Sequence, residues 1–62
     1  MISENIKNLR IEKNLTQKQL AEALNVSLKT ISHWESGYTE PSILFIKKLK
    51  VFFNISYEDL LD

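Results

Sequence analysis

Polar side chains suited to hydrogen bonding gather in the middle of the chain, between residues 16 and 37. Lys29 and His33 are four residues apart, so they share one face of a helix, outside its apolar positions. A lysine can donate to O6 and N7 of guanine, and a histidine can donate or accept at a base edge. His33 is the only histidine, and Glu35, two residues away, lies on another helix face. A lone histidine without a cysteine or a carboxylate on its helix face argues against catalysis and metal binding. The spacing leaves two interpretations open: the two side chains contact base edges, or they are solvated surface side chains.

Composition and charge fit one small folded domain. The chain has 62 residues, of which 44% are apolar and 26% charged, values typical of a globular protein. It has no cysteine, which excludes disulfides and thiolate zinc sites and favours an intracellular location. Eight basic residues balance eight acidic ones, so any nucleic-acid binding depends on where the charges lie. We expect a cytoplasmic protein without cofactor or metal, because no apolar run could span a membrane and no secretion signal is recognisable.

The spacing of apolar and capping residues predicts five helices and no strand. The expected helices cover about residues 3–13, 16–24, 27–36, 43–53 and 56–61. The predicted N-caps are Ser3, Thr16, Ser27, Ser42 and Ser56. The predicted stop signals are Asn14, Asn25, Gly37 and Asn54, residue types that accept the left-handed backbone conformation. Short connections between short helices favour a compact array over a long bundle.

Residues 16–37 have the pattern of a helix-turn-helix. The small side chain of Ala21, halfway along the first helix, lets the second helix approach closely. Asn25 suits the tight turn, and Val26 and Ile31 fill the angle between the two helices. The second helix then stands out from the surface, where it can enter a major groove.

Short motifs along the whole chain resemble the Cro/C1-type helix-turn-helix family of phage and bacterial repressors, also called the Xre family. The matching stretches are Ile6–Arg10, Leu15-Thr16-Gln17, Leu20-Ala21, Val26-Ser27, Thr30-Ile31-Ser32, Trp34-Glu35, Gly37, Pro41-Ser42, Asn54-Ile55-Ser56 and Leu60-Leu61. The resemblance implies an all-α, compact, five-helix, lambda-repressor-like domain that binds operator DNA as a dimer. Residues 1–62 would form this single domain, with the helix-turn-helix at about 16–36 and core and dimer contacts at about 42–61.

The resemblance also implies roles for individual side chains. The expected base-reading residues are Leu28, Lys29, Ser32 and His33. The expected phosphate contacts are Gln17, Lys18, Ser27, Thr30 and Tyr38. The expected structural residues are Ala21, Trp34 and the ion pair Arg10–Glu35, which would tie the first helix to the end of the third. Three alternatives stay open: Leu28 could belong to the core instead, Gln17 could be solvated, and Arg10 and Glu35 could be two independent surface charges.

The chain departs from the family pattern in several places. The family often has glycine where this chain has Asn14 and Asn25, which also accept a left-handed backbone. After Gly37 the family often has lysine or arginine, whereas this chain has Tyr38-Thr39-Glu40, with no cation and one anion. The phosphate contact of this loop would therefore depend on the Tyr38 hydroxyl. Lys50 occupies a position that is usually small in the family, so we expect the packing of the fourth helix to differ there.

The fourth helix has more apolar residues than one face needs. Ile43, Ile46, Leu49 and Phe53 form the expected core stripe. Surplus apolar area on a small domain usually marks an interface, and a wide core contact is the alternative. The expected dimer interface consists of Phe52, Ile55, Tyr57 and Leu61.

These observations predict a non-enzymatic, sequence-specific transcriptional regulator, a repressor that binds a pseudo-palindromic operator as a homodimer. Within the same fold, the alternatives are an antitoxin with a toxin partner, or a restriction-modification controller; an anti-repressor could also be a partner. From another functional class, a protein-interaction module that has lost DNA binding would explain the missing loop cations.

Overall fold

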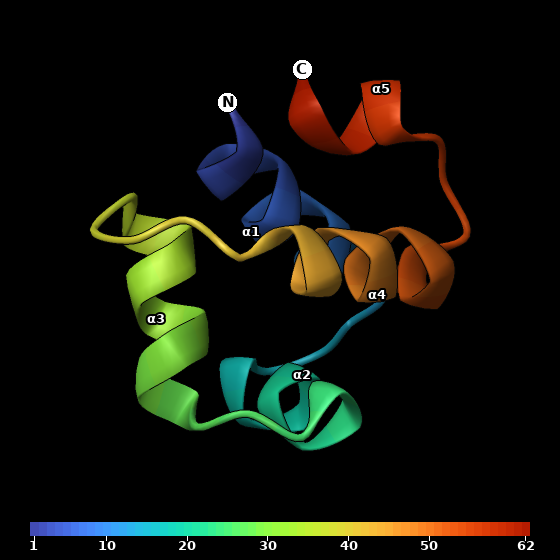
Figure 1. The fold of residues 1–62 in the computed structure, drawn as a ribbon. Helices are drawn as coiled ribbons and strands as arrows, with labels where there is room; N and C mark the ends of the chain where they lie inside the picture. Colours follow the sequence, from blue (N-terminus) through green and yellow to red (C-terminus); the bar gives the residue numbers. More distant parts are fainter.

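The computed structural model describes all 62 residues and consists of five helices without a strand (Figure 1). The helices are α1 (Ile2–Glu12), α2 (Gln17–Leu24), α3 (Leu28–Ser36), α4 (Ile43–Phe53) and α5 (Tyr57–Leu61). Their bounds lie within one or two residues of those expected from the sequence, and the predicted all-α, five-helix fold class is confirmed. No helix has the length and apolar character that crossing a membrane requires.

Side-chain caps begin four of the five helices. Thr16 and Gln19 form a capping box, in which the backbone N–H of Gln19 donates to Thr16 Oγ1 at 3.0 Å and that of Thr16 donates to Gln19 Oε1 at 2.8 Å. Ser27, Ser42 and Ser56 cap the next three helices, as predicted.

The predicted N-cap at Ser3 is wrong. α1 begins at Ile2, with Met1 as its N-cap, and Ser3 lies buried inside the first turn. The physical reason is that Ile2, Ile6 and Leu9 all contact the core. Their spacing of four and three residues places them on one side of a helix only when the helix includes Ile2.

The connections turn at residues with a left-handed backbone, as the sequence predicts. Gly37 has a φ of 80°, and three asparagines adopt φ between 54° and 58°. These asparagines are Asn14, Asn25 and Asn54. Asn25, Gly37 and Asn54 are the C-caps of α2, α3 and α4, and Asn14 follows the C-cap of α1. Each of these residues therefore lies where one helix ends and the chain turns toward the next.

Nine apolar side chains form the buried core. They are Ile6, Leu20, Ala21, Leu24, Ile31, Trp34, Leu49, Phe53 and Leu60. All five helices contribute, so the core lies where they cross. Trp34 is only 5% exposed, which confirms its predicted place in the core.

The prediction for the core stripe of α4 is wrong at its first position. Ile43 is 79% exposed, whereas Leu49 and Phe53 are buried and Ile46 packs against the core. The reason is that Phe45 faces inward, with its ring centroid 5.5 Å from that of Trp34. Because successive helix residues are about 100° apart, Ile43 then points to the opposite side.

The two ends of the chain meet beside α5. The amino group of Met1 donates a hydrogen bond to the backbone oxygen of Asp62 at 3.3 Å, and both termini lie at the same edge of the molecule (Figure 1). The side-chain amide of Asn5 donates to the backbone oxygen of Leu60 at 2.9 Å. The Nζ of Lys50 lies 5.2 Å from the ring centroid of Tyr57, so this lysine links α4 to α5.

Candidate nucleic-acid interface

The turn between α2 and α3 has the geometry of a helix-turn-helix. Asn25 ends α2 in the left-handed conformation, and the backbone N–H of Val26 donates to the oxygen of Ala21 at 2.9 Å. Ala21 is 3% exposed and Ile31 is fully buried, so the two helices are closely packed. α3 runs along one side of the molecule (Figure 1), with α2 and α1 packed against its inner face.

A buried ion pair fixes the end of α3 to α1. The Nε of Arg10 lies 2.7 Å from Oε2 of Glu35, and Nη2 of Arg10 lies 3.0 Å from Oε1. Their side chains are only 13% and 3% exposed, and Nη1 of Arg10 also donates to the backbone oxygen of Leu15 at 2.7 Å. The bidentate geometry sets the orientation of both side chains. The ion pair predicted from the sequence is therefore present.

The hydrogen bond from Arg10 to Glu35 raises the pKa of the Arg10 guanidinium, and their mutual attraction adds to that rise against the opposing effect of burial. A group with a raised pKa contributes its full stabilisation below its ordinary pKa in the unfolded chain. For an arginine this pH window covers all conditions under which the protein is studied. The link between α1 and α3 therefore does not change with pH through titration of Arg10.

Gln17 brings α2 into the same network. Its Nε2 donates to Oε1 of Glu35 at 3.1 Å. The Glu35 carboxylate, on α3, therefore accepts hydrogen bonds from Arg10 on α1 and from Gln17 on α2. The side-chain amide expected to contact phosphate thus has an internal partner. The backbone N–H groups of Gln17 and Lys18, in the first turn of α2, have no acceptor within the chain. Such groups at a helix start bind anions well.

A small polar hollow of about 180 Å³ opens beside the start of α2. Its lining has no apolar residue and consists of Lys7, Gln17, Ser32, Glu35 and Ser36. Lys7 and Ser36 were not among the sites expected from the sequence. A sequence signal for Lys7 existed, because it precedes Arg10 by three residues and so shares its helix face. The ammonium group of Lys7 and the hydroxyl of Ser32 suit a phosphate oxygen, whereas the Ser36 hydroxyl already donates to the backbone oxygen of His33 at 3.2 Å. The negative charge of Glu35 in this lining is balanced by Arg10.

The outer face of α3 carries most of the expected base-reading side chains. Leu28 is 50% exposed, which excludes the alternative that it belongs to the core. Lys29 is exposed and has no hydrogen-bond or ion-pair partner in the chain. His33, one turn further along, is half-buried because its ring packs on Tyr38, with centroids 4.7 Å apart. Ser32 differs, because it lines the polar hollow with Gln17.

Of the remaining side chains expected to contact phosphate, two form hydrogen bonds within the chain and two are exposed. The hydroxyls of Ser27 and Thr30 lie 2.9 Å apart, and Ser27 also accepts from the backbone N–H of Thr30 at 3.1 Å. Ser27 therefore acts first as the cap of α3. Lys18 is exposed, and Tyr38 is 77% exposed beside the His33 ring. The structure thus groups Lys18 with the free start of α2, and Tyr38 with the end of α3.

Nearly the whole chain is similar to known proteins. A family described as helix-turn-helix matches residues 6–60. The chain is 46% identical over 59 residues to the HTH-type transcriptional activator BcrR of Enterococcus faecalis, covering 95% of this chain and 29% of BcrR. It is 37% identical over 60 residues to the antitoxin PezA of Streptococcus pneumoniae, covering 97% of this chain and 38% of PezA. The chain therefore spans less than half the length of these two relatives.

A solved structure shares the whole fold. The crystal structure of SinR, the master regulator for biofilm formation, in complex with DNA matches with a TM-score of 0.88 and 35% identity. The match covers 100% of both chains. Sequence and structure thus agree over all five helices. The chain belongs to the Cro/C1-type helix-turn-helix family.

Proposed function

We propose that this chain is a sequence-specific DNA-binding transcriptional regulator whose helix α3 enters the major groove. The observation that carries this proposal is the contrast between the two sides of α3. Its inner side is held by the buried pair of Arg10 and Glu35, whereas Leu28 and Lys29 project from its outer side without partners in the chain. A rigid helix with free side chains outward is what base reading requires.

On this proposal, three side chains of α3 contact the base edges of one operator half-site. Lys29 donates to guanine O6 and N7, and His33 contacts the edge of a neighbouring base. Leu28 offers an apolar group to a thymine methyl. The packing of Tyr38 on His33 limits the orientations of the imidazole, which favours one hydrogen-bonding direction.

Phosphate contacts on this proposal surround the polar hollow. The free N–H groups of Gln17 and Lys18 bind one phosphate, with Lys7 and Ser32 beside it. Phosphate contacts set the register and orientation of a protein on the duplex, and base contacts supply the specificity. The uncharged Tyr38 serves the loop as a hydroxyl donor.

The proposed active form is a homodimer on a pseudo-palindromic operator. The formal net charge is zero, so the electrostatic part of DNA affinity is small and two linked half-sites are needed for tight binding. The proposed contact uses Phe52, Ile55, Tyr57 and Leu61. Tyr57 and Leu61 are 42% and 46% exposed, whereas Phe52 and Ile55 are half-buried against the core. We therefore assign the larger part of the contact to Tyr57 and Leu61.

Similarity to PezA favours one second candidate, the DNA-binding part of an antitoxin with a toxin as partner. Both candidates use α3 on DNA, so they differ in partner and not in the site. A pure protein-interaction module fits less well, because the partnerless outer face of α3 would then have no role. We propose no catalytic activity, and the cytoplasm as the location, because DNA is the proposed target.

An electrophoretic mobility shift experiment tests this function. The labelled duplex is the promoter region of the gene itself, and the control is an unrelated duplex of equal length and base composition. We expect a discrete complex on the promoter DNA that survives an excess of the unrelated duplex. Equal binding to both duplexes, or none, would contradict the proposal and favour the interaction module.

A further inference from the structure

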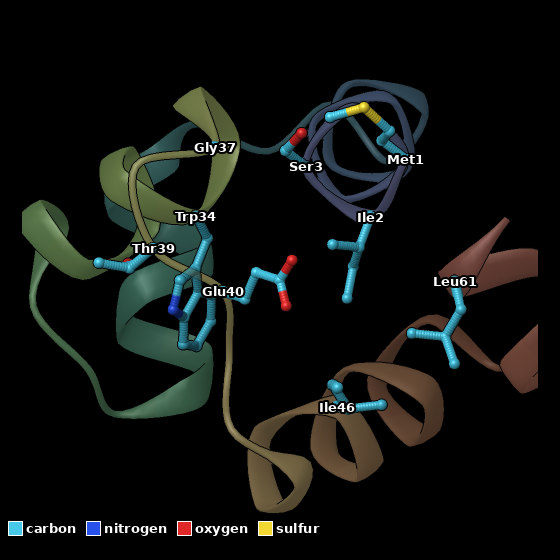
Figure 2. Close-up of a pocket in the computed structure, with 9 residues that line it drawn as sticks. All are labelled: Met1, Ile2, Ser3, Trp34, Gly37, Thr39, Glu40, Ile46 and Leu61. Atoms are coloured by element: carbon cyan, nitrogen blue, oxygen red, sulfur yellow. The ribbon is translucent and has the colours of Figure 1, made fainter.

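A cavity of about 440 Å³ lies away from the outer face of α3 (Figure 2). It opens between the first turn of α1, the loop after α3, the middle of α4 and the end of α5. The proposed DNA contacts do not use it. Its volume lies within the range of about 300–1000 Å³ that is common for small-molecule sites.

The walls of this cavity are mostly apolar. Ile2, Ile46 and Leu61 surround it with Met1, and Trp34 closes it on the side of α3 (Figure 2). Apolar walls favour a ligand with a hydrocarbon body, because its burial removes apolar surface from water. An indole ring also attracts cations through its electron-rich face.

The lining of the cavity includes one carboxylate, that of Glu40. The side chain of Glu40 reaches into the space between Trp34 and Ile2, with its carboxylate near the middle of the surrounding residues (Figure 2). It has no hydrogen bond and no ion pair in the chain, whose one salt bridge is that of Arg10. The buried Pro41 follows it and restricts its backbone to extended conformations, which fixes the direction of the loop.

We infer that this cavity binds an organic cation, an ammonium group on a compact apolar body. The carboxylate of Glu40 pairs with the ammonium group, and the apolar walls enclose the hydrocarbon. A carboxylate ligand of equal shape is repelled by Glu40, and a neutral alcohol loses the ionic attraction. The bound cation also touches Trp34, which belongs to the helix that we propose to read DNA. The binding itself does not depend on that proposal.

Three probes of nearly equal shape test the charge selection. They are 2-phenylethylammonium, 2-phenylethanol and 3-phenylpropanoate, each titrated into the isotope-labelled chain while backbone amide signals are followed by NMR. Trp34, the only tryptophan, gives a second readout by fluorescence. We expect saturable shifts at the amides of residues 2–3, 37–40, 46 and 61 with the ammonium probe. The alcohol should bind about tenfold more weakly, as loss of a charge-assisted contact predicts, and the propanoate not at all.

Glu40→Gln is the decisive variant, and Glu58→Gln is its matched control on α5, outside the cavity. Both residues are exposed, so both variants should fold. Glu40→Gln should reduce the affinity for the ammonium probe to that for the alcohol, and Glu58→Gln should leave it unchanged. Equal affinities for all three probes, shifts away from the cavity, or no binding would overturn the inference. The proposed dimer contact predicts a concentration-dependent shift at the Leu61 amide alone among these reporters. Concentration-dependent shifts at the amides of residues 2–3 and 37–40 without any probe would assign the cavity to a second copy and would also overturn the inference.

Discussion

At the scale of single residues, a role could be predicted from the sequence when the partner lies only a few positions away along the chain. Caps such as Thr16 and Ser27 were predicted correctly, because their partners are three residues away and the pattern is local. The bond from Gln17 to Glu35 spans 18 residues and was not predicted. The pair of Arg10 and Glu35 was predicted only through the family resemblance, because no local rule relates residues 25 positions apart.

The proposed base reading by α3 predicts a sequence-dependent loss of DNA affinity in two variants. Lys29→Ala and His33→Ala should each weaken operator binding by about 1–3 kcal/mol and relax the preference at particular base pairs. Their melting temperatures should barely change, since Lys29 is exposed and His33 loses only its contact with Tyr38. Fluorescence anisotropy on duplexes with single base changes measures this, with Lys13→Ala as the control. An equal loss on every sequence would show a phosphate contact instead.

The buried pair predicts that stability and DNA affinity fall together. Glu35→Gln should lower the free energy of unfolding by about 2 kcal/mol, because it leaves the guanidinium of Arg10 partly buried without its counter-charge. Urea denaturation measures the stability, and the same preparation gives the operator affinity. Glu22→Gln, on the exposed surface of α2, should change neither by more than about 0.5 kcal/mol. An unchanged urea midpoint in Glu35→Gln would show that the pair does not support α3.

At the scale of the elements, the sequence predicts where helices end better than how they rotate. The three asparagines and Gly37 have the predicted left-handed backbone, because few residue types accept it. The rotation of α4 was wrong at Ile43, since its apolar residues fit more than one stripe. The contact of Phe45 with Trp34 selects the stripe, and this contact exists only after α3 and α4 have packed.

The turn of the helix-turn-helix predicts a conformational effect at Asn25, whose φ is 57°. Asn25→Ala should destabilise the chain by about 1 kcal/mol, because a Cβ-bearing residue without a polar side chain tolerates this backbone poorly. Asn25→Gly should be nearly neutral, since glycine adopts positive φ freely. The free energies of unfolding in urea distinguish the two variants. Asn8→Ala, on the exposed face of α1, is the control and should not destabilise. Equal losses for the alanine and glycine variants would contradict this account.

At the scale of the whole molecule, a balanced charge and a small size favour the proposed cooperation between two copies on DNA. A chain of 62 residues can spare only a few hundred Å² for a contact, so the proposed dimer is weak and DNA reinforces it. The sequence indicated surplus apolar side chains around α4 and α5, but not which of them pack on the core and which stay exposed. In the structure, Phe52 and Ile55 pack partly on the core, whereas Tyr57 and Leu61 stay exposed.

The proposed dimer predicts the behaviour of charge substitutions near the C-terminus. Leu61→Glu and Tyr57→Glu should remain folded, because both side chains are exposed, but should bind single half-sites without cooperativity. Leu44→Glu is the control, since Leu44 is 58% exposed and lies outside the proposed contact. Sedimentation with and without a palindromic duplex gives the stoichiometry. If both variants still bind two to one with native cooperativity, the dimer uses another surface.

Selection of bound sequences from a random pool of DNA duplexes tests the central claim, sequence reading by α3, most directly. The native chain should enrich a pseudo-palindrome whose half-sites lie about 34 Å apart, one turn of the double helix. Lys29→Ala, selected in parallel, should lose the preference at one or two positions of each half-site and keep it at the others. Recovery of an unenriched pool by the native chain, or of the same consensus by both proteins, would contradict the account.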